Sequence, residues 1–138
     1  MRLLLDTCVI IDWLTDADPF ERNVWDILND PDTKLYVSAE TARELIVSFN
    51  NKKLLSKYWK TAEEMLVAMK EEAMVDILPI SERTMFTYSR LTLNEAQDHR
   101  DPSDHVIIAH AITEHLTLLS SDQKFAFYRS QGLNLIEY

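Results

Sequence analysis

The stretch RLLLDT at residues 2–7 predicts the fold class of this chain. Its three leucines form a short apolar run, as expected for a strand buried on both faces of a parallel sheet, and the run stops at Asp6. Residues 7–14 then carry apolar side chains at helical spacing, which predicts a helix immediately after the strand. A buried strand followed directly by a helix is the repeating unit of an α/β protein.

The same alternation of strand and helix continues to the end of the chain. Further short apolar runs predict strands at residues 35–37, 75–80, 116–119 and 133–136. Helical patterns lie between them at residues 20–28, 39–49, 54–74 (with a break near Ser56), 81–93, 102–112 and 123–128. We therefore expect a three-layer α/β fold, with a central, mostly parallel sheet of four to five strands and helices on both faces. No repeat or linker interrupts the pattern, which predicts a single domain over residues 1–138.

The composition of the 138 residues excludes several classes of protein. A single cysteine excludes an internal disulfide and a multi-cysteine metal site, and a single glycine excludes a glycine-rich phosphate loop. The net charge of −9 argues against a protein that simply coats nucleic acid. The first apolar run is too short for a signal peptide, and no stretch approaches the roughly 20 apolar residues that cross a bilayer. We expect a cytoplasmic protein without membrane contact.

Four acidic residues are placed where they could meet. Asp6 and Asp122 follow predicted strands, and Glu44 and Asp104 lie on helices that begin at the same edge of the sheet. Ligands of open α/β sheets bind at this edge, outside the carboxyl ends of the strands. Carboxylates that converge raise the cost of ionising one another, and a hard divalent cation such as Mg²⁺ removes that cost.

Structural roles could also account for several of these acids one at a time. Asp6 and Asp122 could each cap the helix that follows, and Asp101 before Pro102 is fully explained as a helix N-cap. Glu40 lies one turn before Glu44 and is a second candidate for the acid on that helix.

At four segments the chain resembles the PIN-domain nucleases, and among them the VapC-like toxins of bacterial type II toxin–antitoxin pairs. LLLDT at residues 3–7 resembles the first motif of the family, and residues 37–45 resemble the second. HRDPSD at residues 99–104, with the apolar helix after it, is the most specific of the four. LLSSD at residues 118–122, with Phe125 beyond it, resembles the fourth. The four segments occur in the family's order and at its spacing.

The resemblance implies a PIN-like fold and a metal-dependent endoribonuclease that needs Mg²⁺ or Mn²⁺. It also implies an RNA substrate and a small antitoxin protein as partner. The exposed parts of Trp13, Trp25 and Trp59 could anchor a homodimer or the antitoxin. The acids that would hold the metal and carry out catalysis are Asp6, Glu44, Asp104 and Asp122, with Thr7, Ser120 and Asp101 as polar neighbours. The alternative is a catalytically inactive PIN-like module that binds other proteins, an option favoured by the low overall basicity.

A locally basic segment could contact RNA. Residues 43–60 carry five positive side chains against Glu44 alone: Arg43, Lys52, Lys53, Lys57 and Lys60. Helical spacing of the last three, with Trp59 adjacent, predicts a phosphate-binding ridge with a stacking aromatic ring. The alternative is a solvated helix face with Trp59 turned into the core. The spacing of the four histidines does not fit a zinc site, so no role was predicted for them.

Overall fold

The fold is built around one parallel sheet. The computed structural model describes residues 1–52 and 54–138, and the sheet has the strand order β3-β2-β1-β4-β5 with every neighbouring pair parallel. The first strand of the chain therefore lies at the centre, and the predicted parallel α/β sheet is confirmed. The strands are β1 (Arg2–Leu5), β2 (Lys34–Ser38), β3 (Val75–Leu78), β4 (Thr117–Ser120) and β5 (Asn134–Glu137).

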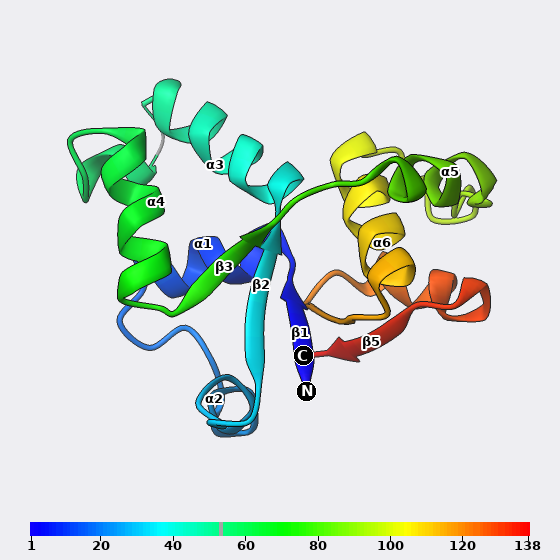
Figure 1. Ribbon diagram of the computed structural model, residues 1–138, viewed down its shortest axis with the longest axis horizontal. Helices are drawn as coiled ribbons and strands as arrows, with labels where there is room; N and C mark the ends of the chain where they lie inside the picture. Colours follow the sequence, from blue (N-terminus) through cyan, green and yellow to red (C-terminus); the bar gives the residue numbers. More distant parts are fainter. Residues whose placement is uncertain (53) are drawn as a thin grey trace.

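Helices cover both faces of this sheet and complete three layers (Figure 1). One face carries α1 (Thr7–Thr15), α2 (Arg22–Leu28), α3 (Ala39–Asn50) and α4 (Ala62–Glu71), together with the 3-10 helix η1 (Leu54–Lys57). The other face carries α6 (Pro102–Glu114) and the 3-10 helix η2 (Gln123–Gln131), with α5 (Glu82–Arg90) packed against α6. Among the helices of the described residues, none has the length and apolarity needed to cross a lipid bilayer.

The leucines of β1 supply both cores. Leu3 and Leu5 pack with the helices of one face, whereas Leu4 packs with α6 and η2 on the other. All three are fully buried. Because side chains alternate across a strand, a continuous apolar run is what a strand covered on both faces requires.

Polar side chains cap the helices that start at the carboxyl edge of the sheet. Asp6 and Asp122 follow strands and Ser38 is the last residue of one; each accepts a hydrogen bond from a backbone N–H in the first turn of the next helix. Asp101 caps α6 in the same way. These caps satisfy N–H groups that a helix terminus otherwise leaves unpaired. The same edge therefore gathers several acidic side chains.

The helix predicted at residues 54–74 is wrong in its first half. The chain forms the short η1 there, and α4 begins only after Thr61, whose hydroxyl accepts from the N–H of Glu64. A good N-cap at Thr61 starts a new helix instead of continuing an old one. The helical ridge predicted for the lysines is therefore absent from the described residues, and Lys53 lies outside them.

Candidate metal centre

Asp6 is held rigidly at the end of the central strand. It is 4% exposed; its Oδ1 accepts from the N–H of Thr7 at 2.8 Å and its Oδ2 accepts from Ser120 Oγ at 2.7 Å. The Cys8 thiol also donates to Oδ2, at 3.3 Å. Burial, reinforced by the negative charge of Asp122, raises the pKa of Asp6 despite these three donors. Asp6 is thus both the predicted helix cap and a buried carboxylate that forms no ion pair within the described residues.

Asp122 reaches the same place from β4. Its backbone N–H donates to Ser120 Oγ at 3.1 Å, and its Oδ1 accepts from the N–H of Lys124 at 2.9 Å. Ser120 is fully buried and connects the two acids, because its hydroxyl donates to Asp6 while accepting from Asp122. The predicted position of Ser120 beside the acids matches this geometry.

Glu44, not Glu40, is the acid of α3 that turns toward Asp6. Thr7 Oγ1 donates to Glu44 Oε1 at 2.7 Å, so the first turn of α1 links the two residues. Burial raises the pKa of Glu44, and the charges of Asp101, Glu40 and Asp6 add to this effect.

Glu40 is occupied elsewhere. Its Oε1 accepts from Arg43 Nε at 3.0 Å and from Ser103 Oγ at 2.7 Å. The Arg43 guanidinium lowers the pKa of Glu40, so this acid already has its cation. Arg43, which is predicted to contact RNA, is therefore already engaged in an ion pair with Glu40.

Asp104 is anchored by a chain of buried hydrogen bonds. Its Oδ2 lies 2.9 Å from His99 Nε2, and His99 Nδ1 lies 3.0 Å from the Tyr128 hydroxyl. The hydroxyl in turn accepts from the N–H of Asn94 at 3.1 Å. His105 forms a hydrogen bond with the backbone of His99, because its Nε2 lies 3.0 Å from the His99 carbonyl oxygen. Burial lowers the pKa of both histidines.

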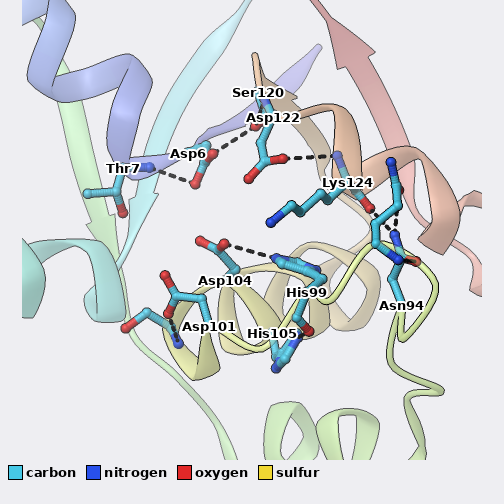
Figure 2. Close-up of polar contacts among 12 residues, drawn as sticks. Asp6, Thr7, Asn94, His99, Asp101, Asp104, His105, Ser120, Asp122 and Lys124 are labelled. Carbon is cyan, nitrogen blue, oxygen red and sulfur yellow. Dashed lines mark hydrogen bonds and ion pairs between the residues drawn. The ribbon is translucent and has the colours of Figure 1, made fainter.

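The carboxylates of Asp6, Asp104 and Asp122 turn toward one shared space (Figure 2). The pKa of Asp104 is raised to about 8. Burial is the main cause, and the negative charges of Asp6, Asp101, Asp122 and Glu44 add to it. Of the acids drawn in the figure, Asp101 is turned toward Ser103, whose N–H it accepts at 2.9 Å as the cap of α6. Asp101 acts on the cluster through its charge.

The donors in this space fit a hard divalent cation. Carboxylate oxygens are the ligands that Mg²⁺ and Mn²⁺ prefer, and burial together with the neighbouring negative charges raises the pKa of Asp6, Glu44 and Asp104. His99, Asp104 and Asp122 each offer one atom, and these three atoms lie within 4.8 Å of one another. A cation here would neutralise charges that destabilise the fold.

A known protein family matches most of the chain. The family model of the PIN domain matches residues 3–130. The chain belongs to the PIN domain family. The resemblance seen in the four sequence motifs is thereby confirmed. No curated protein is significantly similar to this PIN domain in sequence.

Solved structures show the same fold over nearly the whole length. The VapBC2 complex of Rickettsia felis, bound to a promoter DNA fragment, contains a chain with TM-score 0.74 and 20% identity, covering 99% of this PIN domain and 98% of that chain. VapBC-1 of nontypeable Haemophilus influenzae gives TM-score 0.73 and 22% identity with the same coverage. FitAcB of Neisseria gonorrhoeae gives TM-score 0.67 and 25% identity, covering 98% and 96%. The predicted PIN-like architecture is confirmed.

Two further side chains reach the cluster, and the sequence pattern predicts neither of them. His99 holds Asp104, although the spacing of the histidines pointed to no role for it. Lys124 extends from η2 into the space between the acids (Figure 2). Both depend on the folding of the loop before α6, where Asn94 Nδ2 also donates to the Lys124 carbonyl oxygen at 3.1 Å. The available signal was adjacency, since His99 precedes Asp104 by five residues and Lys124 follows Asp122 by two.

Proposed function

We propose that this PIN domain, acting as one domain over residues 1–138, is a divalent-metal-dependent endoribonuclease and the toxin of a type II toxin–antitoxin pair. The observation that carries the proposal is the convergence of buried, charge-strained acids at the carboxyl edge of the sheet in a chain of this family. Asp6, Glu44, Asp104 and Asp122 would hold the ion, Mg²⁺ or Mn²⁺. When bound, it would supply Lewis-acid chemistry for phosphodiester hydrolysis.

The protein's own part is to fix the position and orientation of these acids. Ser120 and Thr7 donate hydrogen bonds to Asp6 and Glu44, which sets the direction of each carboxylate. His99 does the same for Asp104. Residues that hydrogen-bond to the ligands of a metal orient those ligands and tune the affinity for the metal. Asp101 adds negative charge beside the site without turning into it.

RNA would reach the site across a basic depression at the end of α3. Lys52, Lys57 and Lys60 line this depression of about 900 Å³ together with Tyr58 and Trp59. Trp59 is half-buried and packs against the core, as the alternative reading anticipated, whereas the Tyr58 ring is 50% exposed. We assign the lysines to phosphate contacts and Tyr58 to base stacking. Arg43, paired with Glu40, is the weakest candidate among the described residues.

The antitoxin is the partner that the comparisons favour. The structures named above come from VapBC complexes and from FitAcB. We propose a small antitoxin for this PIN domain as well, a cytoplasmic location for the pair, and a homodimer of the toxin. Trp13 and Trp25, considered as anchors for a partner, instead pack edge-to-face on each other and on Phe20.

The decisive test is RNA cleavage by matched Asp→Asn variants. Asp6→Asn and Asp104→Asn should each lower the Mn²⁺-dependent cleavage rate by a factor of 100 or more, on the order of the loss expected when a metal ligand is removed. Asp26→Asn is the control, because Asp26 is exposed on α2, far from the carboxyl edge of the sheet. Equal cleavage by all four proteins would exclude the nuclease assignment.

The alternative, a catalytically inactive module that binds other proteins, makes a different prediction. Such a module need not bind a cation, so calorimetry of Mn²⁺ binding separates the two functions. Millimolar or tighter binding that disappears in Asp6→Asn supports the nuclease. Absence of Mn²⁺ binding, with intact binding of an antitoxin, supports the module.

A further inference from the structure

The side chain of Lys124 enters the acid cluster from η2. Figure 2 shows its ammonium group directed into the space that Asp6, Asp104 and Asp122 surround. The residue is half-buried, and its positive charge adds to the effect of burial in lowering the pKa of His99. Arg43 of α3, by contrast, is paired with Glu40.

The backbone of Lys124 is fixed on both sides, which places its Cα beside the acids. Its N–H donates to Asp122 Oδ1 at 2.9 Å, and its carbonyl oxygen accepts from Asn94 Nδ2 at 3.1 Å. The neighbouring Phe125 is fully buried in the core beneath η2. A lysine that snorkels to solvent points its ammonium away from the protein, whereas the ammonium of Lys124 points toward the acids (Figure 2).

We propose that Lys124 is a specificity-determining residue of the metal centre: its ammonium is a resident cation that shares the carboxylates with a single divalent ion and takes the place of a second. This inference rests on the proposed function. Two-metal centres place their ions about 4 Å apart, a distance at which a fixed positive charge strongly disfavours another dication. The ammonium also stabilises the cluster before any metal arrives, because it offsets part of the repulsion among the acids.

The test compares Lys124→Met with Lys34→Met. Methionine has a similar length and no charge, and Lys34 is exposed at the start of β2, on the opposite edge of the sheet. In Mn²⁺ calorimetry the wild type should bind one ion, and Lys124→Met should bind Mn²⁺ about tenfold more tightly. In chelator, Lys124→Met should melt roughly 2–4 °C below the wild type, because the acids lose their counter-charge. Lys34→Met should match the wild type in both measurements, and Lys124→Arg should restore both.

The outcomes separate this inference from the function on which it rests. Two Mn²⁺ ions in the wild type, or equal affinity of wild type and Lys124→Met for a site that Asp6→Asn abolishes, would overturn the role of Lys124 and leave the nuclease intact. Failure of every protein to bind Mn²⁺ would overturn both. Tighter binding combined with lower stability in chelator is the result that supports the inference, since a purely structural lysine would lower stability without improving metal affinity.

Discussion

Replacing Asp104 with asparagine should stabilise the metal-free protein, and the gain should grow with pH. The Asp104 side chain is only 18% exposed, and its pKa rises from 3.8 to about 8 in the folded protein. The folded state therefore binds this proton more tightly than the unfolded chain does. The stability that the proton contributes is complete below pH 3.8 and is lost as the pH rises to about 8.

The size of the effect follows from the shift. A displacement of about four pKa units corresponds to an upper limit of about 6 kcal/mol at alkaline pH, at about 1.4 kcal/mol per unit. Because neighbouring acids share the repulsion, we expect Asp104→Asn to exceed the wild type by about 2 kcal/mol or more at about pH 8.5, and by little at about pH 5. The new amide oxygen can still accept from His99 Nε2.

The assay is urea unfolding of both proteins in chelator at the two pH values. Adding Mn²⁺ should raise the stability of the wild type and leave Asp104→Asn nearly unchanged, because only the wild type retains the full set of carboxylates. A variant that is equal to or less stable than the wild type at both pH values would refute the reasoning. Asp104 would then be an ordinary helix residue that stabilises the N-terminus of α6.

Three further changes test other parts of the structure. Tyr128→Phe removes the hydroxyl between Asn94 and His99, and should lower the free energy of unfolding by about 1–3 kcal/mol and weaken Mn²⁺ binding, measured by urea unfolding and calorimetry. Thr61→Ala removes the cap of α4 and should cost about 1 kcal/mol by the same unfolding assay, with Mn²⁺ affinity unchanged. The double change Lys57→Ala with Lys60→Ala should weaken RNA binding and flatten its dependence on salt by about one to two units of slope, measured by fluorescence anisotropy with the cleavage-deficient protein.

The parts of the site that depend on strand order could be predicted from the sequence. Asp6 and Asp122 end apolar runs, and in a parallel sheet those ends share one edge, so their proximity follows from topology alone. His99 and Lys124 could not be found this way. Their positions depend on how the loop before α6 packs on Tyr128 and η2, which involves contacts between residues about 30 positions apart.

The error at residues 54–74 has a different cause. Apolar spacing continued across Tyr58 and Trp59, and it masked the cap at Thr61 that starts α4. The rings of Tyr58 and Trp59 lie 5.6 Å apart and line a surface depression, so their spacing reflects local packing of a turn rather than one face of a helix. A hydrophobic period shorter than about three turns does not distinguish the two.

Asp6 and Asp122 are helix caps as well as proposed metal ligands, so a substitution at either position can remove activity without changing the fold. An amide in place of either carboxylate still accepts the backbone N–H that begins the helix, because asparagine caps as well as aspartate does. An inactive variant with asparagine at either position would consequently keep the surface shape of the active protein, and a partner that recognises that shape would bind both.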